Sequence, residues 1–262
     1  MELIAPPHWR YVDFISDLHI DAQTPLTLAT LRRYLESTPA QAVCVLGDLF
    51  EVWVGDDTLG SDGGVEATVA DLFYQASKRL AVYIMCGNRD FLMGSGLLRA
   101  CGAQRLGDPC LLVAGTQRWL LTHGDALCLA DTDYLAFRQR VRSEPWQTAF
   151  LAQTLAQRQS AAHAMRTQSE AKKRQQAQSH VEWIDLDASA CLAALQDANA
   201  KHMVHGHTHQ PAQHDLGGGH SRWVLSDWDL HATPPRAQAL RLSVDTGGVE
   251  RVDALHPFSP SA

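Results

Sequence analysis

The sequence of 262 residues predicts an α/β layered fold, and three features of its pattern lead to this prediction. Short apolar runs of strand length recur along the chain, and stretches with the apolar spacing of a helix separate them. Each run ends near a polar motif, which fits a fold that carries its site at the carboxyl ends of strands. A stretch of helical character from about residue 133 to 200 then interrupts the alternation.

The strands are predicted from runs rich in β-branched and aromatic residues. Five such runs lead into polar motifs: Tyr11–Ser16, Ala42–Leu46, Val82–Cys86, Trp119–Thr122 and His202–His205. Two further extended runs, Trp223–Ser226 and Ala239–Val244, follow a turn of three glycines. We expect these two runs to complete a second sheet.

Helices are predicted between the first three strands. Apolar residues at positions 28, 31 and 35 give Leu26–Glu36 a helical period, and Val65–Leu80 has the same spacing. Residues 133–200 are rich in Ala, Gln, Arg and Leu and contain a single proline. We predict that 133–200 form a helical cap, inserted into a core made of residues 1–132 and 201–262.

Composition limits the class of protein. Hydrophobic residues make up 45% and charged residues 19%, as in an ordinary soluble domain. The net charge of −7 argues against a nucleic-acid partner, because binding phosphates requires a basic face. The six cysteines form no C-x-x-C pair, and neither a signal peptide nor an apolar run of membrane-spanning length is recognisable. We expect a reduced cytoplasmic protein that is a monomer.

The candidate site consists of polar residues that follow the predicted strands. Asp17 and His19 alternate about a leucine, so the strand period of two places both on one face. His207 and His209 alternate in the same way after another strand. Carboxylate, amide and imidazole donors at adjacent strand ends are what a pair of divalent ions requires, which indicates a metal-dependent hydrolase. The donors are Asp17, His19, Asp48, Asn88, His123, His207 and His209.

In chain order, the motifs D-x-H, G-D, G-N-x-D, H-G-D and G-H-x-H resemble the pattern of the calcineurin-like metallophosphoesterases across residues 11–212. The resemblance implies a four-layer α-β-β-α sandwich with an inserted helical cap. It also implies two divalent ions, for which we expect Mn2+. The implied ligands are Asp17, His19 and His209 for one ion, Asn88, His123 and His207 for the other, and Asp48 as the bridge.

Arg89 narrows the expected reaction. Most members of the superfamily have a histidine after the asparagine, and it donates a proton to an alkoxide leaving group. Arginine stays protonated and cannot act as an acid, but it can stabilise the charge of a phosphate. A site with Arg89 suits a leaving group that needs no proton, which favours pyrophosphate cleavage. The alternative is that Arg89 merely forms a surface salt bridge.

Longer stretches around Asp48, Asn88 and His123, with Tyr134–Arg138 and His205–Pro211, resemble a bacterial family of lipid A synthesis, the UDP-2,3-diacylglucosamine pyrophosphatases. The resemblance implies hydrolysis of UDP-2,3-diacylglucosamine to UMP and 2,3-diacylglucosamine 1-phosphate (lipid X) by water activated between two metals. It also implies that the cap encloses the acyl chains. The implied catalytic residues are Asp48, Arg89 and His207, and the implied substrate contacts are Asn88, Arg89, Asp131, Ser169, Lys173 and His207.

Several questions stay open at this level. The register near Lys173 is open, because the chain departs there from the family's pattern. The acidic run of Glu51, Asp56 and Asp57 either supports the site or forms a solvated loop. A soluble metal-dependent phosphodiesterase or nucleotide pyrophosphatase is an alternative function. A non-catalytic scaffold is another, although such proteins usually lose ligands and every ligand position is filled here.

The predicted cap suggests a membrane surface as a further partner. From Arg138 to Arg174 there are eight basic residues and two acidic ones. Trp146, Phe150 and Leu155 form an apolar face beside this charge. A basic and apolar surface suits docking on an anionic membrane, where an acylated substrate resides. We therefore expect a peripheral protein on the cytoplasmic face of the bacterial inner membrane.

Overall fold

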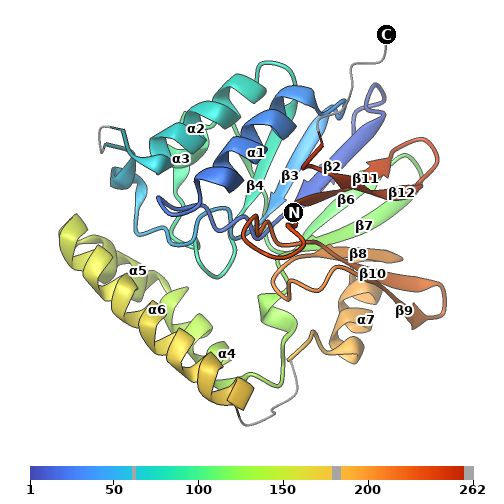
Figure 1. The fold of residues 1–262 in the computed structure, drawn as a ribbon. Coiled ribbons are helices and arrows are strands. Elements are labelled where there is room, and N and C mark those ends of the chain that lie inside the picture. Colours follow the sequence, from blue (N-terminus) through green and yellow to red (C-terminus); the bar gives the residue numbers. More distant parts are fainter. Residues whose placement is uncertain (61–62, 179–183, 257–262) are drawn as a thin grey trace.

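Two six-stranded sheets lie face to face in the computed structural model, and helices cover their outer sides (Figure 1). The structure describes residues 1–60, 63–178 and 184–256, with the backbone alone over 168–178. An apolar layer that includes Phe14, Trp119 and Leu121 fills the space between the sheets. The chain therefore has the predicted α/β architecture.

The first sheet has the strand order β12-β11-β2-β3-β4-β5. Strands β2 to β5 run parallel, and β11 joins β2 antiparallel. Its central strands are almost wholly apolar because both faces of the sheet are covered. The strands are β2 (Tyr11–Ile15), β3 (Ala42–Leu46), β4 (Ala81–Met85), β5 (Gln104–Arg105), β11 (Gln238–Ser243) and β12 (Val249–Asp253).

The second sheet has the order β1-β6-β7-β8-β10-β9, in which β7, β8 and β10 are parallel. The prediction that Trp223–Ser226 and Ala239–Val244 complete one sheet together is wrong. β10 pairs with β8, whereas β11 pairs with β2 in the first sheet, and apolar periodicity carries no information on pairing partners. The strands are β1 (Glu2–Ile4), β6 (Cys110–Ala114), β7 (Gln117–Thr122), β8 (His202–His205), β9 (Gln213–Gly217) and β10 (His220–Val224).

Helices form the two outer layers. The first sheet is covered by α1 (Pro25–Ser37), α2 (Val65–Ala76) and α3 (Ser95–Ala100), which bury residues such as Leu31 and Phe73 against it. The second sheet is covered by α7 (Ala188–Asp197), whose Cys191 and Leu195 pack against Met203 of β8. The predicted four-layer α-β-β-α sandwich is confirmed.

Three helices follow β7 and lie to one side of the sandwich (Figure 1). They are α4 (Thr132–Val141), α5 (Glu144–Leu151) and α6 (Leu155–Gln178). The predicted cap over 133–200 also includes α7, which packs on β8 and β10 in the outer layer of the sandwich. The division into a core and a cap stays a prediction, and the packing groups α7 with the core.

Two expectations from the composition concern the cysteines and membrane-spanning helices. All six cysteines are buried and free, and burial raises the pKa of the Cys86 thiol to about 11. Among the residues that the structure describes, no helix combines the length and the apolar character needed to cross a membrane.

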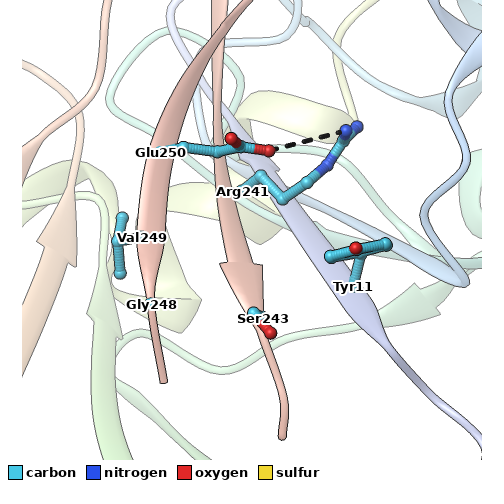
Figure 2. A pocket seen from close by; sticks show the side chains of 6 residues that line it. All are labelled: Tyr11, Arg241, Ser243, Gly248, Val249 and Glu250. Atoms are coloured by element: carbon cyan, nitrogen blue, oxygen red, sulfur yellow. Dashed lines mark ion pairs between the residues drawn. The ribbon is translucent and has the colours of Figure 1, made fainter. Parts of the chain in front are cut away.

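A buried ion pair joins the first sheet to α1. Arg241 donates from Nε and Nη2 to the two oxygens of Asp13, each at 2.8 Å. Tyr34 and Thr38 donate to the same carboxylate, each at 2.7 Å. Figure 2 shows Arg241 between Tyr11 and Glu250 in a groove at the start of β2. The polar motif of β2 lies at the opposite end of this strand, so the groove is separate from the candidate site.

We predict that Arg241→Ala lowers the free energy of unfolding by about 3–5 kcal/mol, because it leaves the Asp13 charge buried without its cation. Urea unfolding followed by circular dichroism measures this loss. The exposed Arg10 provides the control, and Arg10→Ala is expected to stay within about 0.5 kcal/mol of the parent chain. A loss of less than about 1 kcal/mol for Arg241→Ala would contradict the structural role of the pair.

Candidate active site and metal centre

The sandwich gathers the polar motifs at one edge of both sheets. Asp17, Asp48 and Asn88 follow the parallel strands β2, β3 and β4 of the first sheet. His123 and His207 follow the parallel strands β7 and β8 of the second sheet. Parallel strands end at the same edge, so loops that are far apart in the sequence meet across the two sheets.

The backbone at the predicted ligands adopts the left-handed conformation. Among the described residues, six non-glycine residues have positive φ, and five of them are predicted metal ligands. Side chains rarely accept this conformation, and it persists where the surrounding structure imposes it, often at a ligand site. The loops therefore turn these side chains inward at a cost in conformational energy. The five residues are Asp17, His19, Asp48, His207 and His209, with φ between 48° and 69°.

Two glycines leave room for the carboxylates. A side-chain carbon on Gly87 would overlap the Asp48 carboxylate, and one on Gly206 would overlap the carboxylate of Asp17. Glycine is thus required where the strand-end loops pass beneath these groups. This close approach explains the glycine that precedes Asn88 and the one that precedes His207.

The first group of ligands consists of Asp17, His19 and His209. The Nε2 atoms of the two histidines lie 3.2 Å apart, and His209 Nε2 lies 3.3 Å from Asp17 Oδ1. Asp48 Oδ2 lies 3.9 Å from His19 Nε2. The ligand atoms of Asp17, His19 and His209 all lie within 4.8 Å of one another, so one ion can contact all three.

The second group of ligands surrounds Asn88. Its Oδ1 atom lies 2.8 Å from His123 Nε2 and 2.9 Å from His207 Nδ1. The other oxygen of Asp48, Oδ1, lies 3.7 Å from His123 Nε2. Asp48 therefore presents one oxygen to each group of ligands, which is the arrangement that a bridging carboxylate needs.

Electrostatics within the two groups also fit divalent cations. Burial opposes protonation of His123, yet Asp48 and Asp17 raise the pKa of this ring to about 9. Burial lowers the pKa of His207 to about 3, so its ring is neutral and has a free electron pair for a metal. The carboxylates attract positive charge, and the oxygen and nitrogen donors are ones that divalent metals such as Mn2+ accept.

His205 lies in β8, beneath the loop of His207, and is fully buried. Arg222 lies 3.2 Å from its Nε2 atom through Nη1, and Arg222 also forms an ion pair with Asp185. Burial lowers the pKa of His205 to about 4, so the ring is a neutral hydrogen-bond acceptor. His205 is a buried structural residue with its hydrogen bonds satisfied.

Arg89 lies at the site and forms an ion pair there. Its backbone N–H donates to Asp48 Oδ1 at 2.8 Å, and its Nη1 atom lies 3.2 Å from Glu51 Oε1. Glu51 is only 9% exposed, so this pair differs from the solvent-exposed salt bridge considered as the alternative. The guanidinium is thus held next to a carboxylate that also contacts the predicted ligand His19.

Of the acidic run Glu51, Asp56 and Asp57, only Glu51 contacts a described residue of the candidate site, and the other two hold neighbouring helices. Glu51 Oε2 lies 3.0 Å from Nδ1 of His19. Asp56 accepts hydrogen bonds from the backbone at the start of α3, and Asp57 forms an ion pair with Arg158 of α6. Each acid thus has defined partners, so the loop is more than a solvated acidic segment.

Sequence reasoning assigned no role to Asp90 and Asp125, although both end a recognised motif. Asp90 is fully buried and accepts from the backbone N–H groups of Gly87 at 2.7 Å and Leu49 at 2.8 Å, which ties two ligand loops together. Asp125 accepts from Tyr134 Oη at 2.5 Å and from Arg138 Nε at 2.8 Å. The sequence feature that could have indicated a role for Asp90 and Asp125 is the aspartate that ends both G-N-x-D and H-G-D.

Arginines from α4, from the residue after it and from α6 connect the helices that follow β7 to the sandwich. Arg142 donates to the carbonyl of Gly87 at 2.8 Å and lies 3.5 Å from Asp125. Arg158 is 3% exposed and pairs with Asp57, and Arg166 Nη1 lies 3.1 Å from Glu51 Oε1. Four of the eight basic residues between Arg138 and Arg174 therefore face acids of the sandwich. The four are Arg138, Arg142, Arg158 and Arg166.

The predicted substrate contacts are only partly described. Asp131 caps α4 by accepting from Tyr134 N at 3.1 Å, and the Tyr134 ring stacks on His207 with centroids 6.1 Å apart. Ser169 and Lys173 belong to α6, but their side chains lie outside the described residues. These substrate contacts stay predictions.

An apolar surface lies beside Arg142. Trp146 stacks on Phe150 with ring centroids 4.7 Å apart, and Phe91 lies 6.1 Å from Trp146. Phe150 is buried, whereas Phe91, Trp146 and Leu155 are half-buried. The predicted apolar face of the cap thus packs partly against the loop that follows Asn88 and Arg89.

Residues 11–211 match the model of the calcineurin-like phosphoesterase family. The chain belongs to this family, a class of metal-dependent hydrolases. Over 244 residues it is 41% identical to the UDP-2,3-diacylglucosamine hydrolase of Bordetella pertussis, covering 91% of this chain and 93% of that protein. The protein of the same name from Chromobacterium violaceum is 40% identical over 222 residues, covering 83% and 90%. These curated relatives place the chain among the UDP-2,3-diacylglucosamine hydrolases.

We predict that divalent metal stabilises the folded chain, because the ligands come together only in the folded state. Mn2+ at a hundred times its dissociation constant should raise the free energy of unfolding by about 2.7 kcal/mol. Differential scanning fluorimetry with and without EDTA measures the shift in Tm. Replacing the exposed His231 by Ala should preserve the shift, and Asp48→Ala should reduce it. A parent chain whose Tm is unchanged by Mn2+ would contradict the metal centre.

Proposed function

We propose that the chain hydrolyses the pyrophosphate bond of UDP-2,3-diacylglucosamine to UMP and 2,3-diacylglucosamine 1-phosphate (lipid X), a step of lipid A biosynthesis. The observation that carries this proposal is Arg89, which directly follows the predicted ligand Asn88 and whose guanidinium pairs with buried Glu51 beside His19. The curated relatives have the matching name, UDP-2,3-diacylglucosamine hydrolase, along more than four fifths of this chain.

Two divalent ions, for which we propose Mn2+, fit the two groups of ligands around Asp48. Asp17, His19 and His209 would hold one ion, Asn88, His123 and His207 the other, and Asp48 would bridge them. When bound, such ions lower the pKa of a water molecule so that hydroxide forms near neutral pH. Retention of every ligand also speaks against the non-catalytic scaffold.

Side chains of the site would then stabilise the negative charge that develops on the phosphate oxygens. Attack by water on the phosphorus next to uridine breaks its bond to the bridging oxygen, and the sugar phosphate leaves. The leaving phosphate needs no proton, so Arg89 can serve as a fixed positive charge. Arg89 and neutral His207 would stabilise the non-bridging oxygens in the transition state. Asp48, Arg89 and His207 are thus the proposed catalytic residues.

The proposed substrate site extends from the ligands to the helices after β7. Phe91, Trp146 and Leu155 supply half-buried apolar surface on which acyl chains could pack. Asp131 at the start of α4, with Ser169 and Lys173 on α6, completes the proposed substrate contacts beyond Asn88, Arg89 and His207. An enclosing role for 133–200 is part of this proposal.

We predict that the chain with Mn2+ releases UMP from UDP-2,3-diacylglucosamine and turns over bis(p-nitrophenyl) phosphate far more slowly. Asp48→Ala should lower kcat by at least about a hundredfold, because it removes the proposed bridge and its electrostatic contribution. Chromatography of UMP measures the rate, and His231→Ala serves as the control. Preference for the simple diester would instead favour a soluble metal-dependent phosphodiesterase, and near-normal activity of Asp48→Ala would contradict the bridging role.

Docking on an anionic membrane belongs to the same proposal. Half of the basic residues between Arg138 and Arg174 pair with acids of the sandwich, so they contribute little to a membrane surface. Arg140 is exposed, as are Leu151 and Val52, at 44% and 38%. We propose that these exposed residues contribute to the membrane surface together with the basic and apolar residues of the predicted cap. A monomer on the cytoplasmic face of the inner membrane, with no nucleic-acid partner, stays a prediction.

We predict that the chain sediments with vesicles that contain anionic phospholipid and much less with neutral vesicles. Arg140→Gln should weaken binding about fivefold, since one basic residue near the surface contributes about 1 kcal/mol. Arg10→Gln, at an exposed site before β2, is the control and should leave binding unchanged. Equal sedimentation with both kinds of vesicle, or none with either, would argue against docking through charge.

A further inference from the structure

One carboxylate contacts three groups that serve different parts of the proposed reaction. Glu51 Oε2 lies 3.0 Å from Nδ1 of His19, whose Nε2 atom faces Asp17 and His209. The other oxygen, Oε1, lies 3.2 Å from Arg89 Nη1 and 3.1 Å from Arg166 Nη1. A metal ligand, the proposed phosphate clamp and a helix of the cap thus meet at a single buried acid.

The two arginines reach this acid from different parts of the chain. Arg89 follows Asn88 in the loop after β4, and Arg166 belongs to α6. Both guanidinium groups lie within salt-bridge distance of the same oxygen, so two positive charges are held close together. Like charges at such a distance repel, and the carboxylate between them offsets that repulsion.

We propose that Glu51 is a positioning residue for the hydrolase. Through His19 it directs Nε2 toward the first metal ion, and through Oε1 it aims Arg89 and Arg166 at the phosphates of the substrate. This inference rests on the proposed function for the role of the arginines. It deepens that proposal because it assigns to the protein a group that couples metal binding to phosphate binding.

The physical basis is the way in which a partner orients a histidine ligand. A carboxylate that accepts from one ring nitrogen keeps the proton there, so the other nitrogen presents its electron pair to the metal. Glu51 Oε2 lies 3.0 Å from Nδ1 of His19 as an ion pair whose N–H is not yet aligned as a hydrogen bond, and metal binding at Nε2 would align the two groups. Its second oxygen limits the freedom of two long side chains, so less conformational entropy is lost when they bind phosphate.

The neighbouring Asp57 offers a matched comparison. It also pairs with an arginine of α6, Arg158, and so it also joins the cap to the sandwich. In the part of the chain that the structure describes, Asp57 forms no hydrogen bond or ion pair with His19 or Arg89, whereas Glu51 contacts both. A role in holding the cap alone would make the two acids equivalent, and a positioning role would distinguish them.

The first measurement uses Mn2+ alone, without substrate. Isothermal titration calorimetry of Glu51→Gln should show affinity for Mn2+ that is about ten- to a hundredfold weaker at one site, the usual effect of losing a partner of a metal ligand. Glu51→Asp should recover part of the loss because it restores the charge. Asp57→Asn and the exposed Glu36→Gln should bind Mn2+ as the parent chain does.

The second measurement separates kcat from KM at saturating Mn2+. Glu51→Gln should raise KM for UDP-2,3-diacylglucosamine and lower kcat, whereas Asp57→Asn should leave kcat within about threefold. In an Arg89→Gln background, Glu51→Gln should cost less than it does in the parent chain, because two residues that act through one interaction are not additive. The thermal midpoint of each variant, measured beforehand, restricts the comparison to folded chains.

The outcomes distinguish the two proposals. Parent-like affinity for Mn2+ and parent-like kinetics in Glu51→Gln would overturn the positioning role. Equal losses in Asp57→Asn and Glu51→Gln would overturn it as well, since cap attachment would then suffice. If the parent chain releases no UMP, the proposed function fails, but the Mn2+ titration still tests the link between Glu51 and His19.

Discussion

The face-to-face packing of the two sheets is the constraint on which the site depends. An apolar layer that includes Phe14 and Trp119 fixes the distance between sheets whose parallel strands end at a common edge. Only at that separation does Asn88, after β4, come within hydrogen-bonding distance of His123 and His207, after β7 and β8. The proposed metal centre therefore depends on the whole sandwich. A substitution between the sheets would displace the predicted ligands even where the substituted residue does not contact them.

Ion pairs join the helices that follow β7 to the sandwich. Their acids lie in loops of the sandwich, and most of their arginines lie in or next to α4 and α6. Asp125 and Asp57 each receive arginines from these helices, and Glu51 receives one from α6 and one from the loop after β4. The negative net charge and the basic stretch between Arg138 and Arg174 are thus complementary within one molecule. Half of the basic residues in this stretch therefore form ion pairs within the molecule and do not add to a basic surface.

The sequence was sufficient to predict the elements that define the sandwich and the residues at its strand ends, because burial on both faces leaves a strong apolar pattern. It was insufficient for β10 and β11, since the pairing of strands depends on packing between distant segments. Short edge strands such as β1 and β5 also escaped prediction because they have few residues. The roles of Glu51, Asp90 and Asp125 required coordinates, since an acid in a loop has the same appearance in sequence whether it is solvated or buried.

The loop after β3 has a consequence for how such enzymes can be rebuilt. Within ten positions it carries Asp48 at the metal ligands, Glu51 at the junction and Asp57 at the base of α6. A cap transplanted from a relative would bring its own arginines, and these would have to match the acids of this short segment. Residues 48–57 and the helices after β7 would therefore have to be exchanged together, although 84 positions separate Asp48 from Thr132 at the start of α4.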